Sequence, residues 1–191
     1  RYVIDKKLLD ENIEIVKQKA GVPLIGVVKG NGYGFGICEL TKVLLENGIK
    51  TFAVTEVTDI PVLKEILSDE NDILIMRSTC IEAEAKIIAE NGCIATIGSS
   101  EACRIMNEVS KKLGVKTKCH LKIDTGMGRY GFMPSQIQEA IDCYKASNLE
   151  FCGIYTHFSS AFRNAELTKA QLTIFKDCIH QIQKAGYETG V

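Results

Sequence analysis

The sequence lacks several features that mark special classes of protein. Only 3 of its 191 residues are proline and 16 are glycine, which excludes collagen-like and low-complexity chains. The net charge is −1, so there is no electrostatic reason to expect a nucleic acid or an anionic membrane as partner. No apolar run approaches the ~20 residues that span a bilayer, and the N-terminus shows no apolar secretory segment. With 46% hydrophobic residues, we expect an ordinary globular protein with a sizeable core.

The eight cysteines lack the spacing of a metal site. No Cys-x-x-Cys pair occurs, so the sequence offers no zinc motif, and we expect no bound metal. Cys93, Cys119 and Cys152 lie in or beside apolar runs, where a free thiol behaves as a small hydrophobic side chain. We therefore expect a reducing, cytoplasmic compartment.

What the sequence does contain is one repeated pattern: a stretch with helical periodicity, then glycine, then a short apolar run. Glycine just past the last apolar position of a helix is a typical C-terminal cap. The apolar runs do not alternate with polar residues, which is typical of strands buried on both faces of a parallel sheet. The expected strands cover residues 24–28, 51–55, 73–76, 93–97, 119–124 and 151–157. Pro61 and Pro134 suit the first turns of the helices after the second and fifth strands.

This pattern predicts an α/β fold. Six βα units of about 25 residues each amount to three quarters of the ~250-residue (β/α)₈ TIM barrel. We therefore predict a partial TIM barrel, with a doubly wound open sheet as the alternative that periodicity leaves open. In both architectures, active residues gather at the C-terminal ends of the strands.

The first expected strand ends at Lys29, a lone charge after a buried run. Burial lowers the pKa of a lysine and suits it to Schiff-base chemistry. The glycines that follow, at positions 30, 32, 34 and 36, would let the backbone approach a ligand closely. For this segment alone, an exposed lysine before a loose turn is the alternative.

The fifth expected strand places His120, Lys122 and Asp124 on one face. Three polar side chains that point into a barrel need partners, and a network among themselves is one solution. Arg129 follows in a loop flanked by glycines, where its guanidinium can reach a pocket. The sixth strand ends at His157, a candidate acid–base group or ring-stacking partner, or else a hydrogen-bonded structural residue.

The glycines at positions 126, 128 and 131 also match the G-x-G-x-x-G pattern of dinucleotide-binding sites. In such sites the helix begins within the motif and the motif opens its domain. Here Pro134 indicates a helix that begins later, and four units precede the motif. The pattern therefore disfavours a dinucleotide-dependent oxidoreductase.

Together, the three strand ends resemble the pyridoxal phosphate (PLP)-dependent alanine racemase family. The matching segments are residues 28–36 (VKGNGYGFG), 121–131 (LKIDTGMGRYG) and 156–158 (THF), in the same order along nearly the whole chain. The resemblance implies an N-terminal (β/α)₈ barrel followed by a C-terminal β-domain, in a homodimer. Residues 1–191 would then be an incomplete barrel domain.

The resemblance also implies roles for five residues. Lys29 would hold PLP as an internal aldimine and serve as one of two opposed bases. Tyr33 would donate a hydrogen bond to the PLP phosphate, and Arg129 would contact the phenolic oxygen. Lys122 matches a lysine that is carbamylated in some members, where it orients Arg129. His157 would lie beside the cofactor ring.

The sequence departs from the family pattern in two ways. Alanine is more common at positions 30 and 32, histidine at position 35 and an acid at position 162, so cofactor affinity or substrate preference can differ. In addition, the resemblance assigns most of the phosphate site, an arginine facing the pyridine nitrogen and the second base to positions beyond Val191. We therefore expect the 191-residue chain alone to be inactive.

The predicted function is interconversion of L-alanine and D-alanine by a two-base mechanism, on a small amino-acid substrate. Three alternatives stay open from the sequence. They are a serine racemase of the same family, a PLP-dependent decarboxylase of basic amino acids with a related fold, and a non-catalytic PLP-carrying barrel.

Overall fold

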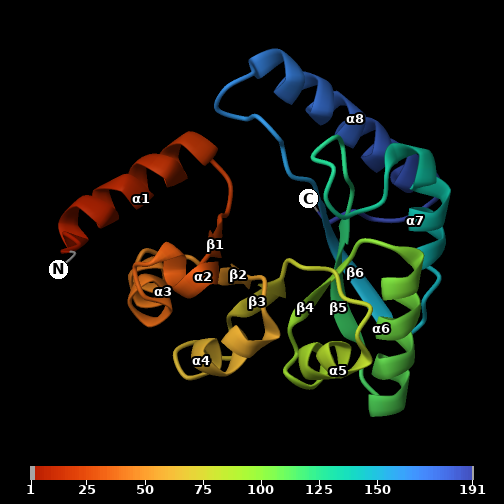
Figure 1. Cartoon of the computed structure of the whole chain (residues 1–191), viewed down its shortest axis with the longest axis horizontal. Helices are drawn as coiled ribbons and strands as arrows, with labels where there is room; N and C mark the ends of the chain where they lie inside the picture. The colour runs from red at the N-terminus through yellow and green to blue at the C-terminus, as the bar shows by residue number, and fades with distance from the viewer. Residues whose placement is uncertain (1–2, 191) are drawn as a thin grey trace. The chain divides into compact units, whose positions relative to one another are not determined.

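The computed structural model describes residues 3–190. The chain forms two compact units, Arg1–Arg77 and Ser78–Val191. Helices and strands alternate along the chain in both units, except that two helices separate the first two strands (Figure 1). Neighbouring strands within each unit pair in parallel. The structure therefore has the α/β organisation that the sequence predicts.

The first unit contains three strands, β1 (Ile25–Val27), β2 (Thr51–Val54) and β3 (Asp72–Ile75). β2 pairs with both neighbours, so that Ala53 lies opposite Val27 on one side and Leu74 on the other. Phe52 of β2 packs in the core with no exposed surface. The helices of this unit are α1 (Lys6–Ala20), α2 (Lys29–Tyr33), α3 (Ile37–Glu46) and α4 (Ile60–Lys64), with the 3₁₀ turn η1 (Val57–Asp59) before α4.

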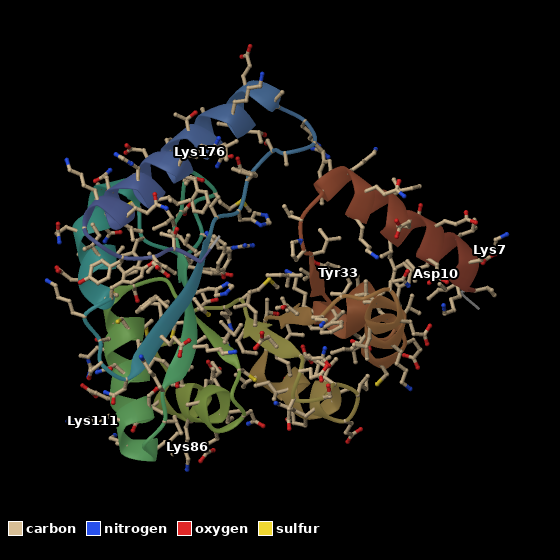
Figure 2. All side chains as sticks on the ribbon, turned by 180° about the vertical axis from the view of Figure 1, so that it is seen from behind. Lys7, Asp10, Tyr33, Lys86, Lys111 and Lys176 are labelled. Carbon is tan, nitrogen blue, oxygen red and sulfur yellow. The ribbon has the colours of Figure 1, made fainter. Side chains whose placement is uncertain are left out.

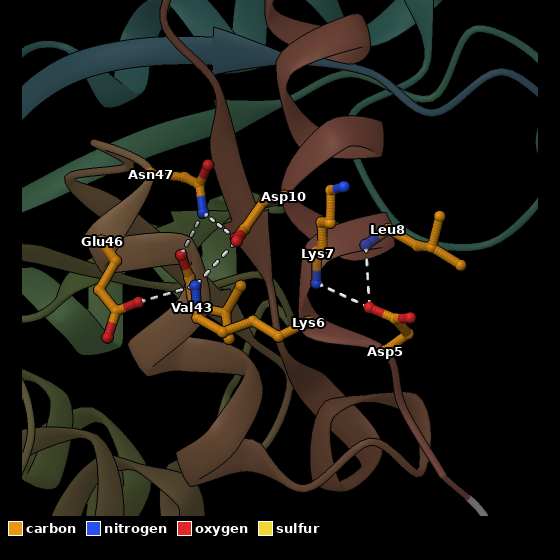
Figure 3. A network of polar contacts seen from close by, with 8 residues as sticks. All are labelled: Asp5, Lys6, Lys7, Leu8, Asp10, Val43, Glu46 and Asn47. Atoms are coloured by element: carbon orange, nitrogen blue, oxygen red, sulfur yellow. Dashed lines mark hydrogen bonds and ion pairs between the residues drawn. The ribbon is translucent and has the colours of Figure 1, made fainter.

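Polar contacts at both ends of α1 explain where this helix begins and how it joins α3. The Asp5 side chain caps the first turn by accepting hydrogen bonds from two backbone N–H groups, and Gly21 ends the helix in the left-handed conformation. Asn47 Nδ2, just after α3, donates to Asp10 Oδ1 and to Val43 O, both at 2.8 Å (Figure 3). These contacts attach α1 to the end of α3.

The second unit contains β4 (Ile94–Ile97), β5 (Thr117–Lys122) and β6 (Leu149–Tyr155). β5 is the middle strand, with Leu121 opposite Ile97 on one side and Ile154 on the other. Leu121 and Ile97 have no exposed surface, which marks the core of this unit. The helices are α5 (Glu82–Glu90), α6 (Ser100–Leu113), α7 (Ile137–Cys143) and α8 (Ala165–Lys184), with the 3₁₀ turn η2 (Pro134–Gln136) before α7.

All six predicted strands are present; the last two lie two residues earlier than predicted and the third lies one residue earlier. The predicted runs 119–124 and 151–157 correspond to β5 (Thr117–Lys122) and β6 (Leu149–Tyr155). The exposed Lys118 and Glu150 interrupt the apolar runs, although their backbones pair with each other. Pro61 lies in the first turn of α4, as predicted. Pro134 opens η2 rather than an α-helix, because α7 begins only at Ile137.

All eight cysteines are free thiols. Cys93 and Cys119 are buried, as expected for thiols that act as packing groups, whereas Cys152 is half-buried. Within residues 3–190, no helix combines the length and the apolar character needed to cross a membrane.

Candidate functional site

Lys29 begins a left-handed turn directly after β1. Val28, which has no exposed surface, extends the strand by donating its N–H to Ala53 O at 2.9 Å. The backbone then turns through four consecutive residues with φ between 53° and 61°, at positions 30–33. Asn31 and Tyr33 adopt this conformation although they are not glycine, which is uncommon. The turn therefore has a regular left-handed backbone conformation at positions 30–33.

Backbone contacts stabilise this turn. Gly32 N donates to Val28 O at 2.9 Å, and Gly36 N donates to Asn31 O at 3.0 Å. The Asn31 side chain accepts a hydrogen bond from the N–H of Ile37, at the start of α3. The turn is thus joined to the strand before it and to the helix after it.

The side chains of Lys29 and Tyr33 lie together at this strand end. Lys29 is half-buried, and its Nζ lies 5.9 Å from the centroid of the Tyr33 ring. The Tyr33 side chain is exposed at the end of α2 (Figure 2). The first unit therefore presents one amine and one phenol side by side.

In the second unit, a carboxylate organises the loop after β5. Asp124 accepts hydrogen bonds from four backbone N–H groups of the loop, those of Gly126, Met127, Gly128 and Arg129, at 2.7–3.2 Å. Such a ring of N–H groups is an anion-binding nest. Burial acts to raise the pKa of Asp124, but the four hydrogen bonds outweigh it and lower the pKa below its ordinary value.

These contacts further disfavour the dinucleotide-binding alternative. The N–H groups that a pyrophosphate would need are already bonded to Asp124. The loop also does not lead directly into an α-helix, because α7 begins at Ile137, six residues after Gly131. The glycines at positions 126, 128 and 131 instead adopt positive φ as the loop passes around the carboxylate.

Lys122 is buried between two aromatic rings. Its side chain is part of a residue only 2% exposed, and Nζ donates to Ile123 O at 2.9 Å. Nζ lies 5.6 Å from the ring centroid of Tyr130 and 5.7 Å from that of Tyr155. Cation–π contacts at this range stabilise a buried ammonium group.

Arg129 contacts the same aromatic group. Its guanidinium carbon lies 5.1 Å from the Tyr130 ring centroid, so Tyr130 borders both cations. Burial lowers the pKa of Lys122 to about 8; the Arg129 charge adds to this shift, and the Asp124 charge opposes it. Lys122 and Arg129 therefore lie near the same Tyr130 ring.

The alternative network of His120, Lys122 and Asp124 is not the arrangement that holds Asp124, whose carboxylate accepts from its own loop. His120 instead faces β6, where its ring centroid lies 6.3 Å from that of Tyr155. Gly153 leaves room for the imidazole, because a Cβ atom there would lie 2.5 Å from His120 Nε2.

His157 lies in the loop after β6. It is exposed and lines a cavity of about 460 Å³ together with the rest of residues 156–163. The loops after β5 and β6 meet where the Thr125 and Thr156 hydroxyls form a hydrogen bond at 2.9 Å. Arg129 and His157 therefore lie on loops that contact each other, whereas Lys29 and Tyr33 belong to the first unit.

Tyr155, whose ring lies 5.7 Å from Lys122 Nζ, is a residue of the candidate site that the sequence analysis did not predict. Its Oη and Thr96 Oγ1 lie 2.9 Å apart, and burial raises the pKa of Tyr155 well above its ordinary value. Its register in the sheet could have revealed it, since Tyr155 pairs directly with Lys122. It was overlooked because an aromatic residue in an apolar strand is typical of a core.

Comparisons with known proteins identify the family to which the chain belongs. Residues 4–191 match the family model for the N-terminal domain of alanine racemase. The alanine racemase of Methanococcus maripaludis is 30% identical over 97% of this chain and 50% of its own length. A solved structure of alanine racemase from Clostridium difficile 630 has a TM-score of 0.88 and 28% identity, covering 96% of this chain and 49% of that one.

A structure of alanine racemase from Bartonella henselae with covalently bound pyridoxal phosphate has a TM-score of 0.84 and 24% identity, over 93% of this chain and 52% of that one. The chain therefore spans about half the length of these relatives. These likenesses confirm the predicted fold class, a truncated TIM barrel with six parallel strands.

Proposed function

Since the chain belongs to the family of alanine racemase N-terminal domains, we propose that it forms the barrel part of a PLP-dependent racemase of L- and D-alanine. The observation that carries this proposal is the set of side chains at the strand ends. They are an amine beside a phenol in the first unit, and a guanidinium on a fixed loop in the second.

The chemistry of these side chains fits PLP. The amine of Lys29 can bind the aldehyde covalently, and the phenol of Tyr33 can donate to the phosphate. The guanidinium of Arg129 can donate to the phenolic oxygen, and the imidazole of His157 can lie against the ring. When bound, PLP acts as an electron sink that makes the α-proton of an amino acid acidic.

Lys29 has two tasks in this proposal. It binds the cofactor through Nζ, and as a free amine it removes or returns a proton at one face of the substrate Cα. Racemisation also needs a base at the opposite face, which we do not assign to any residue of this chain. The left-handed turn at positions 30–33 fixes the backbone from which Lys29 acts.

Lys122 has the task of positioning Arg129. The two cations border the same Tyr130 ring. Burial lowers the pKa of Lys122 to about 8, which favours the neutral amine. A neutral amine can add to carbon dioxide: an N–C bond forms, one C=O π bond breaks, and one N–H proton is released to solvent, leaving a carbamate anion. In that form Lys122 would carry a negative charge next to the Arg129 guanidinium and would attract it.

The remaining parts of the proposal concern surroundings. We propose a small amino acid as the substrate and a homodimer as the assembly, both on the family resemblance. The eight free thiols support a reducing, cytoplasmic compartment.

Borohydride trapping tests the proposal. The full-length protein is loaded with PLP, reduced and mapped by peptide mass spectrometry, and we expect the label on Lys29. Lys29→Arg should abolish both the label and D-alanine formation from L-alanine. Lys42→Arg, at an exposed lysine of α3, is the matched control and should preserve both. A label on Lys122 in place of Lys29 would refute the assignment.

A further inference from the structure

Gln171 is a deeply buried polar residue of α8. It is 1% exposed, and it shares the buried positions of this helix with Cys178 and Ile182. Burial of an amide group costs free energy unless its hydrogen bonds are replaced inside the protein. The contacts of Gln171 therefore indicate what the residue does.

The Gln171 side chain bonds to two different loops. Its Oε1 accepts from the backbone N–H of Ser159 at 3.1 Å and from the Ser159 hydroxyl at 3.2 Å. Its Nε2 donates to the backbone carbonyl of Thr125 at 3.4 Å. Thr125 belongs to the loop after β5 and Ser159 to the loop after β6, so one amide group joins both loops to α8.

The chain makes room for this contact at Gly126. A Cβ atom at Gly126 would lie 3.2 Å from Gln171 Nε2, and the residue has φ of +126°, which favours glycine. The hydroxyls of Thr125 and Thr156 add a second link between the same two loops. The amide contact is thus part of a local arrangement that involves both loops.

The two loops carry two of the proposed cofactor contacts. Thr125 directly follows Asp124, whose carboxylate accepts a hydrogen bond from the Arg129 backbone. A shift of Thr125 would therefore also move Arg129. Ser159 lies two residues after His157. We propose that Gln171 is a positioning residue that sets the Arg129 loop against the His157 loop, an inference that rests on the proposed function above.

Hydrogen exchange in the full-length protein tests the link between the loops. Gln171→Leu keeps most of the side-chain volume but removes all three hydrogen bonds. We expect about tenfold faster amide exchange at residues 124–131 and at Ser159, in proportion to the lost bonds. Gln181→Leu, in the same helix, is the matched control and should leave these amides unchanged. Gln171→Met is the second variant if Gln171→Leu does not fold, because methionine adapts to irregular space.

Cofactor binding tests the positioning role. In Gln171→Leu we expect a shifted PLP absorbance band and about tenfold weaker PLP binding, since two contacts lose their alignment. Unchanged exchange in both loops would overturn the link. Faster exchange throughout the second unit would make Gln171 a packing residue and overturn the inference. Faster loop exchange with an unchanged band and affinity would overturn the positioning role alone. If the wild-type protein fails to bind PLP, the proposed function fails, and the exchange result still decides the link.

Discussion

The Lys29 turn (residues 29–33) and the Arg129 loop (residues 124–131) both follow a parallel strand and present a cation, but they are fixed by opposite means. The Lys29 turn is defined by its backbone conformation, with four consecutive residues at positive φ. The Arg129 loop is stabilised by a side chain, because the Asp124 carboxylate accepts hydrogen bonds from four backbone N–H groups. The turn is held by backbone hydrogen bonds among neighbouring residues in a left-handed conformation, and the loop is held by the charge of one carboxylate.

This difference has consequences for sensitivity. The turn is stabilised within a few residues of itself, by bonds among Val28, Asn31 and their neighbours. The loop depends on groups far apart in sequence, because Gln171 of α8 bonds to Thr125. We therefore expect the turn to respond to added side-chain atoms and the loop to respond to lost polar groups and to pH.

Removal of the Asp124 carboxylate should have the largest effect on stability. In Asp124→Ala four N–H groups lose their acceptor, and since water can replace part of each bond, we expect a loss of about 3 kcal/mol in the free energy of unfolding. Urea unfolding of the full-length protein measures it. Asp142→Ala, at an exposed carboxylate of α7 that pairs with Lys145, should cause no measurable change. Equal effects of the two variants would contradict the role of Asp124.

The same carboxylate predicts a pH dependence. The native pKa of Asp124 is below its ordinary value, so its stabilising effect is fully present above the ordinary carboxyl pKa and disappears as the pH falls through the native pKa. The stability difference between the wild type and Asp124→Asn should therefore be greatest at neutral pH and should shrink in acid. A difference that is constant from neutral to acid pH would exclude an effect of the charge.

The positions of two candidate residues in the fold could be predicted because strand ends can be recognised in the sequence. Apolar runs ending at Lys29 and near His157 placed both residues at the C-terminal edges of strands, where the structure has them. The parallel α/β fold followed from the same runs. These features depend on local composition, which a single sequence displays.

The partners of buried polar groups could not be predicted. Alternation along the strand predicts that Asp124 shares a face with Lys122 and His120. The carboxylate instead accepts hydrogen bonds from the backbone N–H groups of its own loop, because the folded loop brings these donors closest. An aspartate followed closely by two glycines was the available signal. In the sequence, Gln171 cannot be distinguished from an exposed polar residue of a helix. It is buried because two loops distant in sequence pack against it.

Added atoms in the Lys29 turn should have an intermediate effect. Gly30 and Gly32 have nearly the same φ, 60° and 61°, so alanine at either position incurs the left-handed penalty of about 1 kcal/mol. A Cβ atom at Gly30 would meet nothing within 4 Å, whereas one at Gly32 would lie 3.3 Å from Leu40 Cβ and 3.4 Å from Ile37 N. We expect Gly32→Ala to destabilise by about 2 kcal/mol and Gly30→Ala by about 1 kcal/mol in urea unfolding. Equal losses would show that the space around Gly32 does not matter.

Loss of the Tyr155 hydroxyl should have the smallest effect. Tyr155→Phe keeps the ring that lies 5.7 Å from Lys122 Nζ but removes the hydrogen bond with Thr96. We expect a loss of about 1 kcal/mol, because the buried Thr96 hydroxyl is deprived of this bond. Thr96→Val should lower the free energy of unfolding by a similar amount, because it deprives the Tyr155 hydroxyl of the same hydrogen bond.

A double variant tests whether the hydroxyls of Tyr155 and Thr96 stabilise the protein through their mutual hydrogen bond. The double variant removes the Thr96 and Tyr155 hydroxyls together, so neither partner of this bond is left without the other. Tyr155→Phe with Thr96→Val should therefore lose about 1 kcal/mol less than the sum of the single losses. Tyr155→Leu is the matched comparison, since it also removes the ring and should raise exchange at the amides near Lys122, which Tyr155→Phe should not. Additive single losses would show that the two hydroxyls act independently. In that case only Asp124 and Gln171 would remain as examples of stabilisation by side-chain hydrogen bonds, in contrast to the Lys29 turn, which depends on backbone conformation.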